Sequence, residues 1–481
     1  MKLRELLEGV SAVSLSADPS SEITGVTADS RAAGPGMLFI AIRGTKSDGH
    51  KYIPQALEAG AACVVAEEAG GDNTVVVADT RAAYSLIAAN WFGRPADKLI
   101  MMGVTGTNGK TSSAFLFKHI IDVTGGKCGL VGTVEIDTGV RTVEADVTTP
   151  DAMLLQGYFA EMVEAGCTHC AMEVSSHALD QHRVEGIRYA CGLFTNLTQD
   201  HLDYHGDMAT YLAAKAKLFD VCDAGVFNYD DAATAKLLLR SKAPLNLTYS
   251  TSADEADMTA KNVVLKPDGV EYQAVTKGQI ARVSAALPGE FNVYNTLGVL
   301  TVCVAMGMPL TKAAEALRSA KGIKGRIEVV PTNTPYTVYI DYSHTPDSLD
   351  NIGRALRGIS KGRIITVFGC GGDRDRTKRP LMAKAAEAFS DYFILTSDNP
   401  RTEDPQRIID DAYAGVAGTA VPHEVLVDRR QAIAHALAQA GPGDTVLIAG
   451  KGHETYQILA TGKIHFDERE VVHELLGETQ K

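Results

Sequence analysis

The segment Thr105-Gly-Thr-Asn-Gly-Lys-Thr111 holds the residues whose types and spacing point most directly to chemistry. It lies between an apolar run and a helical pattern, where backbone N–H groups and a helix dipole attract phosphate. Lys110 could reach the outer phosphates of a nucleotide, and the Thr111 hydroxyl could hold Mg²⁺. The spacing G-x-x-x-x-G-K-[ST] is not met, since the upstream glycine is Gly103 and position 104 is Val. We nevertheless predict phosphate binding rather than a glycine turn with a surface lysine.

Two further polar residues, Glu173 and His201, follow β-like runs. Ligands gather at the carboxyl ends of parallel strands, so both side chains could face the same crevice as Lys110. A carboxylate and an imidazole beside a phosphate could complete a Mg²⁺ shell with waters, although imidazole is an uncommon ligand for so hard an ion. For His201 alone, a satisfied polar side chain at a strand end is the favoured interpretation. Lys215, judged without context, is a solvated lysine.

Three other patterns point to chemistry that we set aside. Gly369-Cys-Gly-Gly372 follows a strand but lacks the G-x-G-x-x-G spacing of a dinucleotide fold, since position 374 is Arg. Cys167 and Cys170 have zinc-like spacing without a second pair, and are interpreted as small buried hydrophobes. His201 and His205 lack the glutamate of an H-E-x-x-H site. Neither zinc nor a dehydrogenase reaction is therefore expected.

The elements that must position these residues alternate between apolar runs and helical patterns, which predicts βαβ units. Turn-like segments at 93–95 and 321–326 predict domains at 1–97, 98–325 and 326–481. The expected fold is α/β, with a central P-loop domain on a doubly wound, mostly parallel sheet, a C-terminal Rossmann-like sheet and a smaller N-terminal α/β domain. Strands are expected at 37–42, 62–66, 74–77, 99–104, 169–174, 191–196, 225–228, 363–368, 392–396 and 445–449. Helices are expected at 110–123, 151–165 and 207–219, and after Pro346, Pro380, Pro405 and Asp428.

Length and composition agree with this organisation. At about 150 residues per domain, 481 residues suggest roughly three domains. A net charge of -13 weakens any interpretation as a nucleic-acid or anionic-membrane binder. The eight scattered cysteines suggest no disulfide framework, and neither a signal peptide nor a membrane-spanning run is evident. We expect a cytoplasmic protein that does not insert into membranes.

Taken together, the motifs resemble the Mur ligase family, the ATP-dependent amide ligases of peptidoglycan precursor synthesis. The resemblance extends over all three predicted domains and accounts for the Gly-Thr-Asn-Gly-Lys-Thr form of the phosphate loop. Its markers are the segments 105–111, 148–150, 173–179, 196–205, 213–215, 289–295, 325–328 and 341–344. The resemblance implies a role in cell wall biogenesis, and through it in cell shape and division.

Within that family, Asp398-Asn-Pro-Arg401 is most similar to the members that add meso-diaminopimelate to UDP-N-acetylmuramoyl-L-alanyl-D-glutamate. The resemblance implies that Arg401 and Arg374 contact the distal carboxylate of the amino acid, which suits bidentate guanidinium pairing. Gly450 and Glu454 would hold its distal ammonium. The set implied for diaminopimelate is Arg374, Asp398, Asn399, Pro400, Arg401, Gly450 and Glu454. Arg376 and Lys378 are interpreted as a solvated basic loop.

The resemblance also implies the other binding residues. Lys215 corresponds to a lysine that reacts with CO₂ to give a carbamate, an oxygen donor for a second Mg²⁺. The implied metal ligands are Thr111, Glu173, His201 and carbamylated Lys215. For ATP the set is Gly106, Thr107, Asn108, Gly109, Lys110, Thr111, Ser112, Asn295, Arg326, Asp341 and His344. The uridine nucleotide would meet Ser30, Thr45, Lys46 and Ser47, and the muramoyl dipeptide Thr148, Thr149, Ser175, Gln181 and Arg183.

The implied reaction passes through an acyl phosphate. The D-glutamyl carboxylate attacks the γ-phosphate of ATP, and an amine of diaminopimelate then displaces phosphate to form the amide. Lys110, Lys215, Glu173, His201 and Arg326 are the expected catalytic residues, which neutralise charge on the phosphoryl group directly or through Mg²⁺. The third domain must close over the second. The implied partners are these small molecules alone, and we expect a monomer.

Three alternatives stay open from sequence. A P-loop kinase or NTPase would hydrolyse or transfer phosphate without an amine acceptor. A nucleotide-regulated binding protein would bind ATP without turnover. A lysine-adding ligase of the same family is disfavoured by Asn399 and Arg401 together.

Overall fold

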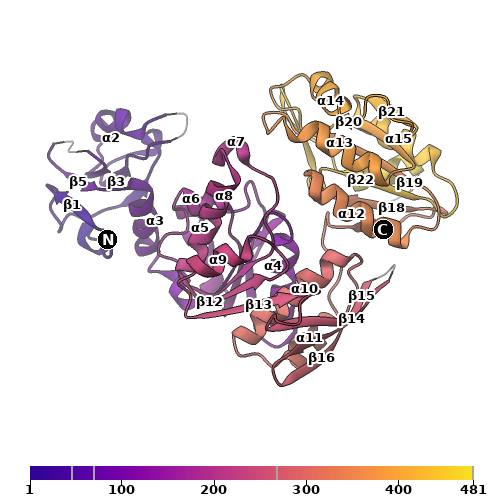
Figure 1. Ribbon diagram of the computed structural model, residues 1–481. Helices are drawn as coiled ribbons and strands as arrows, with labels where there is room; N and C mark the ends of the chain where they lie inside the picture. The colour runs from indigo at the N-terminus through magenta and orange to yellow at the C-terminus, as the bar shows by residue number, and fades with distance from the viewer. Residues whose placement is uncertain (45–46, 69–70, 267–268, 479–481) are drawn as a thin grey trace.

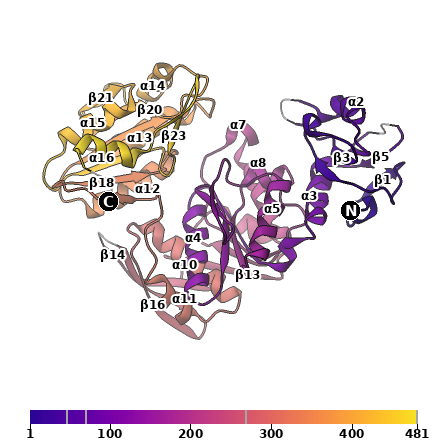
Figure 2. The same cartoon turned by 180° about the vertical axis from the view of Figure 1, so that it is seen from behind.

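A computed structural model describes residues 1–44, 47–68, 71–266 and 269–478 as three α/β domains. In these residues the main sheets have five, eleven and six strands, and a two-stranded ribbon accompanies the last (Figure 1). The expected fold class is confirmed. The first and last sheets lie on opposite sides of the middle one in both views (Figure 2). In the described part of the chain, the helices are all too short or too polar to cross a membrane.

The N-terminal sheet has the order β1-β5-β4-β3-β2, with β1 antiparallel and the rest parallel. Its strands are β1 (Ala12–Leu15), β2 (Gly25–Thr27), β3 (Met37–Ile40), β4 (Cys63–Ala66) and β5 (Thr74–Val77). Helices α1 (Leu3–Leu6), α2 (Ile53–Glu58) and α3 (Thr80–Trp91) accompany it. Asp79 begins α3 by accepting hydrogen bonds from the N–H groups of Arg81 and Ala82. Helix α3 then packs against α5 (Ala152–Glu164) of the middle domain, which joins the two domains.

The middle sheet has a parallel core flanked by antiparallel strands, in the order β16-β15-β14-β13-β12-β11-β6-β10-β7-β8-β9. Parallel pairs run from β14 through β7, as expected for a doubly wound sheet. The core strands are β6 (Ile100–Thr105), β7 (Cys128–Val131), β10 (His169–Glu173), β11 (Tyr189–Phe194), β12 (Cys222–Asn228) and β13 (Leu245–Ser250). The flanking strands are β8 (Glu135–Asp137), β9 (Thr142–Glu144), β14 (Met258–Lys266), β15 (Gly269–Thr276) and β16 (Gln279–Ala285).

The antiparallel strands β14 to β16 are absent from our sequence-based expectations. One of their faces is covered and the other faces solvent, so polar and apolar residues mix along them. This pattern is weaker than the continuous apolar runs of the parallel core.

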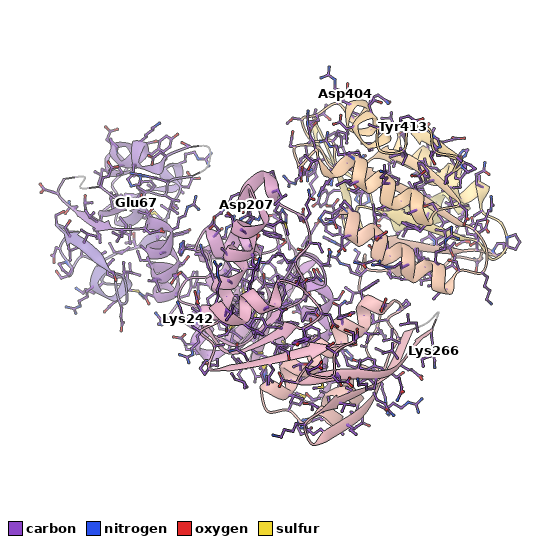
Figure 3. All side chains as sticks on the ribbon, viewed as in Figure 1. Glu67, Asp207, Lys242, Lys266, Asp404 and Tyr413 are labelled. Carbon is purple, nitrogen blue, oxygen red and sulfur yellow. The ribbon has the colours of Figure 1, made fainter. Side chains whose placement is uncertain are left out.

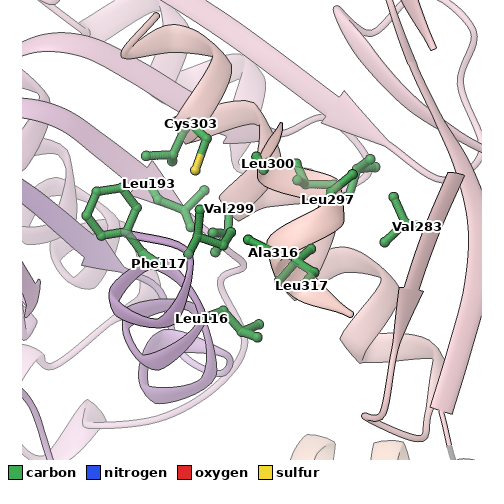
Figure 4. Packing of buried hydrophobic residues seen from close by; sticks show 14 of the residues in the cluster. Leu116, Phe117, Leu193, Val283, Leu297, Val299, Leu300, Cys303, Ala316 and Leu317 are labelled. Carbon is green, nitrogen blue, oxygen red and sulfur yellow. The ribbon is translucent and has the colours of Figure 1, made fainter. Parts of the chain in front are cut away.

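Helices cover both faces of the middle sheet. They are α4 (Lys110–Val123), α5, α6 (Ser176–Asp180), α7 (Leu202–His205), α8 (Met208–Ala216), α9 (Thr234–Arg240), α10 (Glu290–Ala305) and α11 (Leu310–Leu317). Helix α10 is buried almost all round, and its Leu297, Leu300 and Cys303 belong to one core with Phe117 of α4 and Leu193 of β11 (Figure 4). Through this packing, α10 contacts α4, the helix that begins at the phosphate loop.

The C-terminal sheet has the order β17-β18-β22-β19-β20-β21, parallel except for β17. Its strands are β17 (Glu328–Val330), β18 (Thr337–Asp341), β19 (Ile364–Cys370), β20 (Tyr392–Ser397), β21 (His423–Leu426) and β22 (Thr445–Ala449). Its helices are α12 (Pro346–Ile359), α13 (Lys378–Phe389), α14 (Pro405–Tyr413), α15 (Arg429–Gln439) and α16 (Glu468–Leu476). Strands β23 (Tyr456–Leu459) and β24 (Gly462–His465) form the ribbon. Carboxyl ends of the parallel strands carry the loops described next.

Candidate active site

The phosphate loop joins the carboxyl end of β6 to α4, as its sequence predicts. Gly106 (φ +152°) and Gly109 (φ +86°) adopt backbone conformations that other residues rarely take. A Cβ at Gly106 would collide with the Thr195 hydroxyl, and one at Gly109 would lie 2.5 Å from Oδ1 of Asn295. Glycine therefore lets the residues after β11 and the first turns of α10 approach the loop closely.

The start of α4 is open to an anion. Among the described residues, no side chain caps this helix, so N–H groups of its first turn remain for a ligand. Hydrogen bonds hold the loop itself: Thr195 Oγ1 donates to the Asn108 carbonyl over 2.6 Å, and the Asn108 N–H donates to Asn196 Oδ1 over 2.8 Å. The loop is thus shaped before any ligand arrives.

Lys110 and Lys215 donate to the same acceptor, the carbonyl of Gly106. The two N–O distances are 2.9 and 2.7 Å. Burial lowers the pKa of Lys110, against the attraction of Glu173 and Asp200. Lys215 is only 1% exposed, and burial followed by the charge of Lys110 lowers its pKa strongly. The interpretation of Lys215 as a solvated lysine is wrong.

Glu173, Asp200 and His201 lie beside these lysines. Glu173, at the end of β10, is buried and accepts hydrogen bonds from the Thr133 N–H (2.8 Å) and hydroxyl (3.0 Å). His201 Nε2 lies 3.3 Å from Oδ2 of Asp200. Burial lowers the pKa of His201 to about 3 despite that carboxylate, so the imidazole is neutral and can act as a ligand. The structure therefore gathers Lys110, Glu173, His201 and Lys215 as expected.

A cavity of about 660 Å³ opens between the middle and C-terminal domains. This volume lies within the range of ligand sites, about 300–1,000 Å³. Predicted ATP residues on its wall are Asn108, Gly109, Thr111, Ser112, Asn295, Arg326 and Asp341. Lys266, labelled in Figure 3, brings the end of β14 to the same cavity. The aromatic side chains of Phe291 and Tyr294 also line it, a contribution that our sequence reasoning missed.

Arg326 bridges the two domains at this cavity. Its Nη2 donates to the Thr111 hydroxyl over 3.0 Å, and its guanidinium lies 4.8 Å from the centre of the Tyr342 ring. Its Nε is buried without a hydrogen-bond partner in the described residues, which suits a guanidinium awaiting an anion. Burial raises the pKa of Asp341, against the attraction of Arg326. His344 is not on the cavity wall; its Nδ1 lies 2.8 Å from the Tyr342 carbonyl.

Two contacts across the domains were not anticipated. Asp347, in the first turn of α12, accepts a hydrogen bond from the Asn108 side chain over 2.7 Å. Lys378, at the start of α13, places its Nζ 3.6 Å from Oδ1 of Asp200, and both side chains are nearly buried. The interpretation of Lys378 as solvated is wrong, because the partner that buries it comes from another domain. Arg376 is exposed, as expected, although it pairs with Glu403.

A cluster of side chains in the C-terminal domain gathers residues expected to meet the amino acid. Asn399 donates to Glu454 Oε2 over 2.8 Å, and Lys451 Nζ lies 2.7 Å from the same oxygen. Burial, followed by the charge of Asp398, raises the pKa of Glu454. A Cβ at Gly450 would lie 2.5 Å from Asp398 Oδ2, so this carboxylate approaches the backbone closely. The charges of Asp398 and Glu454 are unfavourable for each other, so an incoming ammonium would be suited to this place.

Within the described residues, the two arginines of this cluster have no acidic partner. Arg401 donates through Nη1 to the carbonyls of Gly372 (2.8 Å) and Asn399 (3.4 Å), and Arg374 donates to that of Asp373. In the described ranges no carboxylate oxygen lies within 4.0 Å of either guanidinium. Burial lowers the pKa of Arg401, and the like charge of Arg374 adds to this effect. A carboxylate ligand would offset both the burial of the Arg401 charge and its repulsion by Arg374.

The residues expected to hold the muramoyl dipeptide are linked to one another. Arg183 donates to the Thr149 carbonyl (2.8 Å) and to Gln181 Oε1 (2.8 Å). Ser175 caps α6, and Thr148 accepts from Thr133, which also binds Glu173. In the N-terminal domain, Ser30 and Ser47 are partly exposed polar groups near Gln55 and Tyr52. Thr45 and Lys46 lie outside the described residues.

Comparisons with known proteins match the whole length of the chain. Three family models align in succession: the Mur ligase family catalytic domain with residues 22–91, the Mur ligase middle domain with 104–303, and the Mur ligase glutamate ligase domain with 325–452. The UDP-N-acetylmuramoyl-L-alanyl-D-glutamate–2,6-diaminopimelate ligase of Clostridioides difficile (strain 630) is 42% identical over 99% of this chain and all of its own. That of Caldanaerobacter subterraneus subsp. tengcongensis is 44% identical over all of both. A solved structure of a ligase of this name, 32% identical, superposes with a TM-score of 0.71 over 99% of each chain.

Proposed function

Because this chain belongs to the Mur ligase family, we propose that it is the ATP-dependent ligase that joins meso-diaminopimelate to UDP-N-acetylmuramoyl-L-alanyl-D-glutamate. The relatives at 42–44% identity carry the name of that reaction over their full length. The product is a tripeptide precursor of peptidoglycan. We propose the cytoplasm as its location, where ATP is available, and a monomer as its active form.

The choice of amino acid is supported by one observation: two arginines without acidic partners lie in the same pocket as crowded carboxylates. Diaminopimelate carries both a carboxylate and an ammonium at its distal end, so it complements Arg374 and Arg401 on one side and Asp398 and Glu454 on the other. Lysine has the distal ammonium but not the carboxylate. It would leave the partly buried Arg401 guanidinium beside exposed Arg374 without a carboxylate to offset their like charges.

ATP is assigned to the cavity between the domains. Its triphosphate would lie along the phosphate loop, where the first-turn N–H groups of α4, Lys110 and Arg326 provide positive charge. The D-glutamyl carboxylate attacks the γ-phosphorus and the bond to the ADP oxygen breaks, giving an acyl phosphate. The diaminopimelate amine then attacks the acyl carbon, loses a proton and expels inorganic phosphate. The protein acts through positioning and electrostatics.

The donor set of the site fits Mg²⁺. Thr111 and Glu173 offer oxygen atoms, the ligands that this ion prefers, and neutral His201 offers nitrogen. Among the described residues no three acidic, histidine or cysteine side chains form a metal cluster, so part of the shell would come from phosphate oxygens, water and a modified lysine. Lys215 is suited to modification, because burial favours the uncharged amine that attacks CO₂. When bound, Mg²⁺ would neutralise charge on the phosphates.

The proposed domains are 1–97 for the uridine nucleotide, 98–325 for ATP and the D-glutamyl acyl donor, and 326–481 for the amino acid, which is the acyl acceptor. Contacts of Arg326 with Thr111 and of Lys378 with Asp200 join the last two. Closure of this junction would bring the amine to the acyl phosphate and exclude water.

Phosphate release in the presence of a panel of amino acids tests the proposal. With ATP, Mg²⁺ and the UDP-linked dipeptide, we expect release only when meso-diaminopimelate is added, with L-lysine far less effective. Release without any amine would instead identify an NTPase. Equal rates with L-lysine and diaminopimelate would assign the chain to the lysine-adding branch.

A further inference from the structure

Two loops of the C-terminal domain face each other across the proposed amino-acid pocket: loop 371–376, which carries Arg374, and loop 399–403, which carries Arg401. They pack tightly, because a Cβ at Gly371 would lie 3.0 Å from Arg401 Nη1. Asp373 and Arg401 both have left-handed backbones, with φ of 53° and 54°. Such conformations persist in non-glycine residues only where surrounding contacts hold them.

Glu403 supplies contacts between these loops. Its Oε1 accepts a hydrogen bond from the Asp373 N–H over 2.6 Å, and its Oε2 accepts one from Arg376 over 2.6 Å. Arg379, at 1% exposure, donates to both oxygens from the first turn of α13. Thr402 adds hydrogen bonds to the Asp373 carboxylate. One carboxylate thus joins loop 371–376, loop 399–403 and α13.

The charge of Glu403 is directed away from the pocket. The hydrogen bond from Arg379, followed by other contacts, lowers the pKa of Glu403 to about 2, so the group is ionised at neutral pH. Its two oxygens face Arg376 and Arg379, whereas the acceptors of Arg374 and Arg401 among the described residues are all carbonyls. The like charge of exposed Arg374 is unfavourable for Arg401, so it does not itself hold the two loops together, and other contacts must set their spacing.

We propose that Glu403 is the positioning residue of the amino-acid pocket, where it ties loop 371–376 to loop 399–403 and sets the spacing of Arg374 and Arg401 without neutralising them. The two guanidiniums are then held ready for a distal carboxylate of the substrate. Pre-organisation of this kind reduces the cost of ordering the loops when the ligand binds. The inference rests on the proposed function, because it concerns selection of a dicarboxylic amino acid.

Steady-state kinetics of Glu403→Gln and Glu403→Asp, beside a matched control, test this role. The glutamine keeps the size of the side chain but loses its charge, and the aspartate keeps the charge on a shorter stem. Asp411→Asn is the control, because Asp411 accepts from the same Arg379 (2.8 Å) but makes no hydrogen bond to the described residues of either loop. KM values for diaminopimelate, ATP and the UDP-linked dipeptide are measured, together with the kcat/KM ratio of diaminopimelate to L-lysine.

We expect Glu403→Gln to raise the KM for diaminopimelate about tenfold and to lower the preference over L-lysine, with the other two KM values within about twofold of wild type. Glu403→Asp should recover part of the loss, and Asp411→Asn should change none of the KM values. A wild-type KM for diaminopimelate in Glu403→Gln overturns the inference. Equal increases in the KM for diaminopimelate in Glu403→Gln and Asp411→Asn also overturn it. Such a result would mean that the increase comes from removing a negative charge beside Arg379, not from loss of the contact between the loops.

Two measurements distinguish the positioning role of Glu403 from a purely structural role and from failure of the proposed function. If Glu403→Gln lowers the thermal midpoint without raising the KM for diaminopimelate in the folded enzyme, the role is only structural and the inference fails. If wild-type enzyme does not couple diaminopimelate at all, the proposed function fails, and that result is distinguishable because it appears before any variant is made.

Discussion

Replacement of Arg401 by alanine is the most informative single perturbation of the proposed pocket. The guanidinium is partly buried, and its Nη1 is held by the carbonyls of Gly372 and Asn399, so its remaining donors are aimed without further ordering. A hydrogen bond to a charged group contributes about 1.5–3 kcal/mol, and a guanidinium can make two to one carboxylate. Losing about 3 kcal/mol corresponds to a decrease of roughly a hundredfold in kcat/KM for diaminopimelate.

Phosphate release with each substrate varied in turn measures this loss. The KM for diaminopimelate should carry most of the change, and the KM for ATP should stay near wild type because the nucleotide cavity does not include Arg401. Activity with L-lysine should change little, since it has no second carboxylate. Arg401→Lys should keep only part of the wild-type kcat/KM for diaminopimelate, because an ammonium cannot pair bidentately with a carboxylate. Arg430→Ala, an exposed arginine paired with Glu474, is the matched control. Equal increases in both KM values would refute the assignment.

Three further predictions concern other parts of the molecule. Lys215→Ala should lower kcat by more than a hundredfold while leaving the fold intact. Short carboxylic acids should restore part of the activity of this variant. Full activity of the variant without them would show that no carbamate takes part in the mechanism. Gly109→Ala should weaken ATP binding at least tenfold in calorimetry, because its Cβ would meet Asn295 and the backbone has positive φ; unchanged affinity would contradict the close approach. The pKa of Glu403 is lowered from 4.5 to about 2, so its stabilising contribution is present above pH 4.5 and is lost as the pH falls toward 2. Urea unfolding should therefore show wild type more stable than Glu403→Gln at pH 7 and the difference vanishing near pH 2; a difference independent of pH would be inconsistent with this shift.

Local patterns determined much of the architecture. The apolar run before Gly106 and the helical pattern after Gly109 predicted β6 and α4, and α4 begins and ends where the pattern indicated, at Lys110 and Val123. Such elements are predictable because their hydrogen bonds and periodic faces lie within short segments. Antiparallel β14 to β16 were missed, since a strand covered on one face lacks a continuous apolar run. Parallel strands β7, β13 and β18 were missed as well, although β7 is buried throughout.

The candidate site residues were proposed from the sequence, because each motif combines a residue type with a spacing that resembles a known family. Their environments were not. The sequence could not show that Lys215 is buried beside Lys110, that Lys378 reaches Asp200, or that Glu403 joins loops 371–376 and 399–403.

The amino-acid sequence by itself determined much of the succession of strands and helices, the position of the phosphate loop and the family to which the chain belongs. Only the tertiary structure decided which charges are compensated. Whether a lysine is solvated or buried, and whether an arginine already has an acidic partner, depends on side chains contributed by segments far away in the chain. Electrostatic interactions act through space, and their strength depends on burial, so no local pattern along the chain can determine them.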